Sequence, residues 1–183
     1  MAIQLTPPLA PEDVKPLRAG GRVSITGVMY TARDAAHRKL VELIDSGREL
    51  PLDLNGQVIY YVGPTPASPG RATGSAGPTT ASRMDVYTPR ILARGVRALI
   101  GKGDRSAEVA AALKENDAVY LAAVGGAGAL LAEYILATEP VAWPELGPEA
   151  IYRLEVRDFP AIVVIDTEGG NLYETGRARY RKT

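Results

Sequence analysis

The sequence predicts an α/β domain with a mostly parallel central sheet that is flanked by helices. Several apolar segments are continuous runs, such as residues 119–124 and 161–165, and such runs are typical of strands buried on both faces. Helical patterns lie between these segments, and the alternation of strands with helices favours parallel pairing. With 183 residues, of which 46% are hydrophobic, the chain is long and apolar enough for one domain with its own core.

The prolines of residues 1–20 predict an extended N-terminal arm, with a short helix near residues 11–17. Residues 21–183 are predicted to form a single domain. Its strands are expected where the composition is strand-like and apolar. In chain order, they are residues 22–27, 57–62, 96–101, 118–124, 151–156 and 161–166.

Three helices are predicted between the strands, because apolar residues recur there at helical spacing. Residues 32–46 place Leu40 and Ile44 on one face, and residues 104–116 repeat the pattern. A third helix is expected at residues 128–137. These helices are the ones expected to cover the sheet.

Residues 63–80 form a long connection that is rich in glycine and proline. The segment is too long and too polar for a tight turn, and loops of this length inside a compact domain are usually functional or disordered. Further on, Thr88-Pro89 has the form of a helix start, since proline is favoured at the first helical position.

Composition excludes several classes of function. The net charge is zero, so general attraction to nucleic acid or anionic membranes is not expected. The chain has no cysteine, which excludes disulfides and any thiolate zinc site or cluster ligated by this chain, and with one histidine and no suitably spaced acidic cluster we expect no metal site. Because no apolar run reaches the roughly 18 residues of a membrane span and the first residues do not resemble a signal peptide, a cytoplasmic location is expected.

Residues 77–85 form the most informative motif, Gly-Pro-Thr-Thr-Ala-Ser-Arg-Met-Asp. The Gly-Pro turn is predicted to open a helix, whose unpaired backbone N–H groups would favour an anion. Arg83 lies close to one helical turn beyond Thr79 and Thr80, so it can reach the same spot. The motif therefore predicts an anion site with hydroxyl groups beside it.

A second motif opens the helix at residues 32–46. Thr31 has the form of an N-cap, with Asp34 three residues later as its capping-box partner. Arg33 in the first turn opposes the helix dipole, which indicates a role in binding an anion. His37 lies one turn further on and has two interpretations, a partly buried structural residue or a catalytic one.

Two glycine-containing turns follow later strands. Lys102, in Gly-Lys-Gly, is expected to project from the carboxyl end of a strand, where ligands bind in open α/β sheets; the alternative is a solvated lysine in a tight turn. Residues 125–128, Gly-Gly-Ala-Gly, are interpreted as a turn of close backbone approach, with a degenerate nucleotide loop as the alternative.

The three cations of these motifs suit a small dianion. Arg33, Arg83 and Lys102 each lie at or near a helix start or a strand end. If they converge, they would hold a dicarboxylate through charge-assisted and bidentate hydrogen bonds.

The motifs together resemble a known family. Residues 30–37, 61–64, 77–85 and 101–103 occur in the order found in the beta subunit, or C-terminal domain, of class I iron–sulfur fumarate hydratases and the related L(+)-tartrate dehydratases. The resemblance covers nearly the whole chain. It implies a swivelling β/β/α domain that is part of a hydro-lyase, reversibly hydrating fumarate to (S)-malate or dehydrating tartrate. A non-catalytic dicarboxylate-binding domain that kept the pocket is a further alternative.

The resemblance also implies roles for single residues. Arg33, Arg83 and Lys102 resemble the family's binders of the substrate carboxylates. Thr79 resembles the proposed base that takes a proton from the carbon beside a carboxylate, and Thr80 resembles its binding neighbour. Two further residues of the second motif, Asp34 and His37, are expected to support the site.

A partner is implied as well. In this family a [4Fe–4S] cluster is held by three cysteines of an alpha part, with the fourth iron open to substrate, and a chain without cysteine suits that division. The resemblance therefore implies a two-subunit enzyme, an α2β2 heterotetramer, in which this chain is inactive alone.

Overall fold

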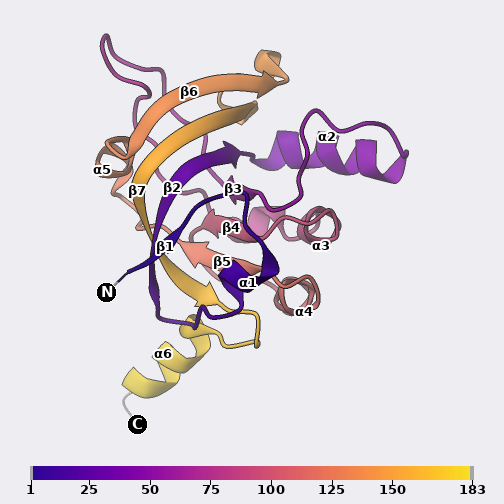
Figure 1. Cartoon of the computed structure of the whole chain (residues 1–183), viewed down its shortest axis with the longest axis vertical. Helices are drawn as coiled ribbons and strands as arrows, with labels where there is room; N and C mark the ends of the chain where they lie inside the picture. Colours follow the sequence, from indigo (N-terminus) through magenta and orange to yellow (C-terminus); the bar gives the residue numbers. More distant parts are fainter. Residues whose placement is uncertain (1, 182–183) are drawn as a thin grey trace.

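A closed five-stranded barrel forms the centre of the computed structural model, which describes residues 2–181 (Figure 1). Strands β2, β3, β4 and β5 pair in that order and in parallel, and β7 is antiparallel to both β5 and β2, so that it closes the ring. The barrel strands are β2 (Arg22–Thr31), β3 (Val58–Tyr60), β4 (Ala98–Gly101), β5 (Val119–Ala122) and β7 (Ile151–Ile165).

Two more strands extend the ring. β1 (Ile3–Leu5) pairs in parallel with β2, and β6 (Ile135–Ala142) pairs antiparallel with β7. The helices are α1 (Pro11–Val14), α2 (Asp34–Asp45), α3 (Thr88–Leu92), α4 (Ala107–Glu115), α5 (Gly128–Ala132) and α6 (Leu172–Tyr180), with 3₁₀ turns at Ala81–Met84 (η1) and Pro144–Glu149 (η2).

The prediction of a swivelling β/β/α domain with a mostly parallel sheet flanked by helices is therefore wrong. The sheet closes on itself, and the element that closes it is the long strand β7. The two strands predicted at residues 151–156 and 161–166 are one continuous strand. The residues between the two predicted strands include polar ones, but Phe159 among them is buried and pairs with Ile25 of β2, so the strand continues.

The third predicted helix is shorter than expected. It ends at Ala132, and β6 begins at Ile135, within the segment predicted as helical. Ile135, Thr138 and Val141 are β-branched, and such side chains fit a pleated strand better than a helix. Pairing with β7 then supplies the backbone hydrogen bonds that the helix would have supplied.

Buried side chains form two clusters. Alternate residues of each strand point to opposite faces, so Tyr60 and Leu121 lie in one cluster while Ile59 and Tyr120 lie in the other. The second cluster packs against α2, α3 and α4, which Figure 1 shows on the side of the parallel strands away from β6 and β7. The helices predicted at residues 32–46 and 104–116, and the helix start at Thr88, are confirmed.

The first twenty residues are integrated into the core. β1 adds to the sheet, α1 forms within the predicted residues 11–17, and Leu5, Val14 and Leu17 are buried. The division of the chain at residue 20 stays a prediction. Among the residues that the structure describes, no helix has the length and apolar character needed to cross a bilayer.

Candidate functional site

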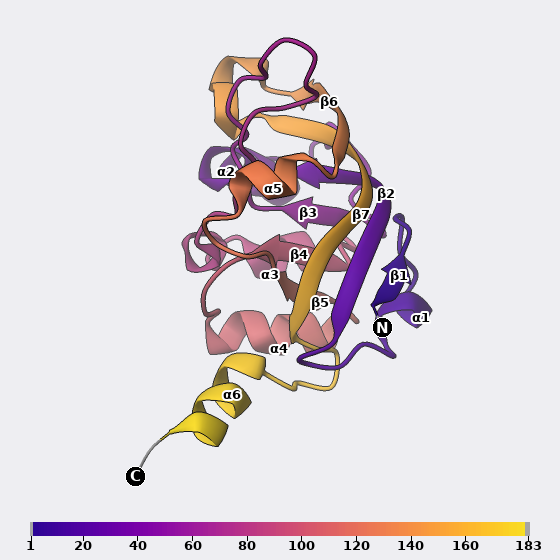
Figure 2. The same cartoon turned by 90° about the vertical axis from the view of Figure 1, so that its left-hand side faces the viewer.

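The candidate site lies at the carboxyl ends of the parallel strands. β2, β3, β4 and β5 run in the same direction, so the residues that follow them share one edge of the barrel (Figure 2). The sequence-predicted residues there are Arg33 after β2, Lys102 after β4 and Gly125 after β5. Cationic side chains from separate parts of the chain thus lie at this edge. The carboxyl ends of parallel strands are where ligands commonly bind in α/β proteins.

Thr79 is held between the ends of β3 and β4. Its N–H donates to the carbonyl oxygen of Tyr61 (2.7 Å), and its carbonyl oxygen accepts from the N–H of Lys102 (3.2 Å). Ala81 N–H then donates to Lys102 O (2.8 Å). Gly101 permits this approach, since a Cβ there would lie 3.1 Å from the Cβ of Ala81. The backbone of Thr79 is thereby hydrogen-bonded to both neighbouring segments, as the backbone of a strand residue would be.

The helix predicted after the Gly-Pro turn is only one 3₁₀ turn, η1, of four residues. Its N-cap is Thr80, whose side chain makes no capping hydrogen bond. The prediction of a helix here is therefore wrong, and so short a turn has little aligned dipole to favour an anion; the anion site itself stays a prediction. Thr79 is half-buried and Thr80 is exposed, and the backbone of Thr79 is bonded to that of Lys102.

Arg83 joins the two principal motifs. Its Nε donates to Oδ1 of Asp34 (3.0 Å), and its Nη2 lies 2.8 Å from Oδ2 of the same carboxylate. The pair connects the end of η1 with the first turn of α2. Because Nε and Nη2 face Asp34, the Nη1 group of Arg83 is left for another acceptor.

Arg33 is held by a residue from a distant part of the chain. Its Nη2 lies 3.2 Å from Oε1 of Glu149, while Oε2 of Glu149 accepts from the N–H of Ala35 (2.8 Å). Glu149 therefore orients Arg33 with one carboxylate oxygen and caps the start of α2 with the other. Its separation from Arg33 in sequence left no local signal by which it could have been found.

The predicted cap at Thr31 is wrong. The residue preceding α2 is Arg33, which makes no side-chain cap. The Thr31 hydroxyl is buried, donates to Ala150 O (3.2 Å) and accepts from Tyr152 N–H (2.9 Å). It serves the pairing of β2 with the start of β7, an interaction that the local capping pattern did not reveal.

The absence of a side chain at Gly63 leaves space for the guanidinium group of Arg33. A Cβ at this position would collide with Nη1 of Arg33 and lie 2.9 Å from Pro148 O. We expect Gly63→Ala to displace the guanidinium and weaken the binding of a small carboxylate dianion about tenfold, the cost of one charge-assisted hydrogen bond. The measurement is the dissociation constant of such a dianion by titration calorimetry. Gly176→Ala on α6, where nothing lies within 4 Å, is the matched control, and an equal dissociation constant in the two variants would contradict the prediction.

Lys102 is exposed and has no ion pair among residues 2–181. Its Nζ lies 3.9 Å from where a Cβ on Gly125 would be. In the same turn, Gly128 O accepts from Ala76 N–H (3.0 Å), and a Cβ on Gly128 would lie 2.9 Å from Gly77 N. The interpretation of residues 125–128 as a turn of close approach is thus confirmed at Gly128.

His37 lies beneath the site, not on its surface. It is fully buried on α2, with Nδ1 2.9 Å from Arg33 O and its ring edge-on to Tyr61 at 5.2 Å. Burial lowers the pKa of His37 to about 4, with the Arg33 carbonyl opposing that shift and Arg105 adding to it. A neutral ring then donates from Nδ1, and Nε2 has no hydrogen-bond partner within the described residues. Its supporting role stays a prediction.

The pKa of His37 predicts a pH-dependent stability. Between pH 6.5 and about 4 the unfolded chain binds a proton at His37 that the folded chain does not, so the free energy of unfolding falls as the pH is lowered. We expect a loss of up to about 3 kcal/mol across this window, from about 1.4 kcal/mol per pKa unit. Urea unfolding at several pH values checks this. In His37→Asn the extra loss should vanish, and an unchanged slope would contradict the assignment.

A buried ion pair next to the site was missed. Arg105 Nε donates to Asp85 Oδ1 (2.7 Å), and the Arg105 side chain has no exposed surface. Asp85 ends the motif at residues 77–85, and Arg105 follows the Gly-Lys-Gly turn by two residues. The sequence signal that could have predicted this ion pair was the presence of opposite charges at the ends of these two motifs.

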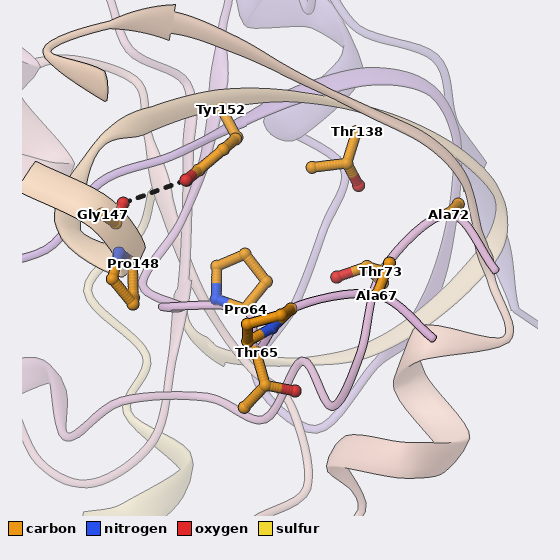
Figure 3. A pocket seen from close by; sticks show the side chains of 10 residues that line it. Pro64, Thr65, Ala67, Ala72, Thr73, Thr138, Gly147, Pro148 and Tyr152 are labelled. Carbon is orange, nitrogen blue, oxygen red and sulfur yellow. Dashed lines mark hydrogen bonds between the residues drawn. The ribbon is translucent and has the colours of Figure 1, made fainter. Parts of the chain in front are cut away.

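A cavity of about 360 Å³ is lined by residues such as Thr73, Thr138 and Tyr152 (Figure 3). Loop 63–80 forms one wall, and its base is ordered by hydrogen bonds such as Tyr60 Oη to Ala76 O (2.6 Å). The other walls come from β6, η2 and β7, where Tyr152 Oη donates to Gly147 O (3.0 Å). None of the predicted cations lines this cavity. Within residues 2–181, no group of three histidine, cysteine or acidic residues is arranged to hold a metal ion.

Comparison with known proteins places the chain in a family. Residues 1–176 match the family described as Fumarase C-terminus. The chain is 44% identical to the anaerobic class I fumarate hydratase of Escherichia coli K12, over 84% of this chain and 28% of that protein. It is 40% identical to a putative class I fumarate hydratase of Geobacillus stearothermophilus, over 94% of this chain and 34% of that protein.

A third relative has a different name and a similar length. The chain is 41% identical to the putative L(+)-tartrate dehydratase subunit beta of Methanocaldococcus jannaschii, over 91% of this chain and 88% of that protein. The chain thus spans about a third or less of the fumarate hydratases that it matches, but most of this subunit. With nearly its whole length matched, the chain belongs to the fumarase C-terminus family.

Proposed function

We propose that this chain forms the carboxylate-binding half of the active site of a hydro-lyase that interconverts fumarate and (S)-malate. The observation that carries the proposal is the collection of Arg33, Thr79, Arg83 and Lys102 at one edge of the barrel. Relatives named fumarate hydratase support the reaction class. Two carboxylates on a small substrate match an edge with three cations.

The cations would do more than bind. Removal of the proton beside a carboxylate moves the electron pair toward that carboxylate, which becomes an aci-carboxylate with greater negative charge. Arg83, with Nη1 left by its pair with Asp34, and exposed Lys102 would then interact more strongly with the transition state than with the bound substrate. This differential interaction raises turnover, beyond affinity alone.

Thr79 is the group that we propose accepts the proton, at Oγ1, with Thr80 as a neighbouring binder. Dehydration then balances: the C–H electron pair forms the new C=C bond, the C–O bond breaks with its electrons on oxygen, and the proton taken up by Thr79 is returned, directly or through solvent, to the departing hydroxide, which gives water and regenerates the base. A neutral alkanol is too weak a base for this step, so Thr79 would act as its alkoxide, whose formation nearby positive charge favours. Its backbone, bonded on both sides, holds the hydroxyl in place.

A partner would complete the site. The chain has no cysteine to hold a [4Fe–4S] cluster, so we propose that an alpha part holds it, in an α2β2 assembly. When bound there, the cluster supplies Lewis-acid activation of the leaving hydroxyl. The match to most of a relative described as a beta subunit supports a partner on a separate chain.

Tartrate is the second candidate substrate, favoured by that same relative. It differs from malate by one hydroxyl, and the cations would bind either dianion alike. The test is an assay of the chain co-purified with its cysteine-containing partner, supplied with malate and with L(+)-tartrate. We expect turnover of malate by the pair and of neither substrate by this chain alone; activity on tartrate only would replace the first candidate, and activity on neither would leave a non-catalytic binding domain.

A further inference from the structure

The ion pair of Arg105 and Asp85 is buried and satisfied on both sides. Arg105 Nε donates to Oδ1 of Asp85 (2.7 Å), and the N–H of Ser106 donates to Oδ2 (2.7 Å). The side chain of Asp85 is 14% exposed and that of Arg105 is fully buried. Both carboxylate oxygens are therefore fixed.

The guanidinium group of Arg105 is also fixed in its plane. It lies over the rings of Tyr61 (5.4 Å to the centroid) and Tyr120 (5.0 Å). Its Nη2 donates to the hydroxyl of Thr88 (2.7 Å), which in turn donates to Met84 O (2.8 Å). Charge, aromatic faces and hydrogen bonds thus all define one orientation.

Stability alone is a weak reason for such a pair. Taking two charges out of water costs several kcal/mol per ion, and well-packed apolar residues of similar size are often as stable. The pair must therefore be judged by what it holds in place. Arg105 contacts the end of β3 through Tyr61, the segment after η1 through Asp85 and Thr88, and itself follows the turn that carries Lys102.

We propose that Arg105 and Asp85 are positioning residues, which fix Thr79 and Arg83 relative to Lys102. Thr79 bonds to Tyr61, and Arg83 is two residues before Asp85. One guanidinium thereby links the three segments that bear the base and two of the cations. Its full burial keeps it away from substrate, so it acts through the others. The inference rests on the proposed function for its catalytic consequence, but not for the geometry.

Arg105→Lys and Asp85→Asn test this role. A lysine keeps the charge but loses the planar fork, and an asparagine keeps the shape but loses the charge. The matched controls are Arg90→Lys and Asp45→Asn, which alter an exposed pair (3.1 Å) between α3 and α2. Two readouts are needed: amide hydrogen exchange of the full chain, and kinetics of the chain in complex with its cluster-bearing partner.

We expect exchange at the amides of Ala81 and Lys102, whose hydrogen bonds join the segments, to become about tenfold faster in both test variants and unchanged in the controls. We expect kcat to fall about 30-fold or more with KM changed less than about threefold, since misplacement of a reacting group by about 1 Å can cost two orders of magnitude. A merely stabilising pair would lower the melting temperature and leave kcat at 25 °C as in the controls.

Each outcome is decisive. Unchanged exchange at Ala81 and Lys102 overturns the inference, and so does a kcat within about threefold of the control variants. If the wild-type complex turns over no dicarboxylate, the proposed function fails, and the exchange measurement alone decides whether Arg105 fixes these segments. If Arg105→Lys does not fold, the isosteric Asp85→Asn carries the test.

Discussion

Replacing Thr79 with alanine should lower kcat by about 10²- to 10⁴-fold, the range that a positioned general base contributes, with little change in KM. The reason is that the substitution removes the proposed proton acceptor but leaves every cation in place. The backbone hydrogen bonds of Thr79 to Tyr61 and Lys102 do not involve its side chain, so the local structure should survive. The measurement is malate dehydration by the reconstituted complex.

Thr79→Ser and Thr80→Ala serve as its controls. Serine keeps the hydroxyl and should retain most of the activity. The exposed Thr80 is proposed to bind and not to take the proton, so its loss should raise KM more than it lowers kcat. Near-normal turnover in Thr79→Ala would rule out the proposed base.

Arg83→Lys should reduce kcat by about 10²-fold and change KM much less. In the structure Arg83 uses Nε and Nη2 on Asp34, which leaves Nη1 for substrate. A lysine is a point charge and cannot bind Asp34 and a substrate carboxylate with the same fork, so stabilisation of the aci-carboxylate is lost. Steady-state kinetics with malate separates the two constants.

Arg90→Lys is the matched control for Arg83→Lys, because Arg90 also forms an exposed pair with an aspartate of α2 but lies away from the strand ends. We expect wild-type kinetics for it. A raised KM with unchanged kcat in Arg83→Lys would show that Arg83 binds ground state and transition state equally, which would overturn its proposed role in stabilising the aci-carboxylate.

Local patterns predicted the elements that local physics determines. The continuous apolar run at residues 119–124 and the helical spacing of Leu40 and Ile44 indicated β5 and α2, since burial on both faces and amphipathic periodicity are written in neighbouring residues. Closure of the barrel was not predictable in this way. It depends on β7 pairing at once with β5 and with β2, and β2 precedes β7 by more than a hundred residues.

The same difference between local and long-range interactions applies to the candidate site. That Arg33 and Lys102 share an edge followed from their places after strands, because parallel strands end together. The sequence did not predict the carboxylates that orient the two arginines. Glu149, which pairs with Arg33, belongs to η2. Asp34, which the sequence assigned to capping, pairs with Arg83 instead. Such pairings form only when the barrel brings distant segments together.

We propose that residues at the carboxyl ends of β2 to β4 bind one dicarboxylate. A crystal structure of this chain in complex with the proposed cluster-bearing partner and (S)-malate would test this binding. We predict carboxylate oxygens within hydrogen-bond distance of Arg33, Arg83 and Lys102, with Thr79 Oγ1 facing the carbon that loses its proton. Malate held only by the partner, or lying in the cavity between loop 63–80 and β6, would show that these residues do not form the dicarboxylate site.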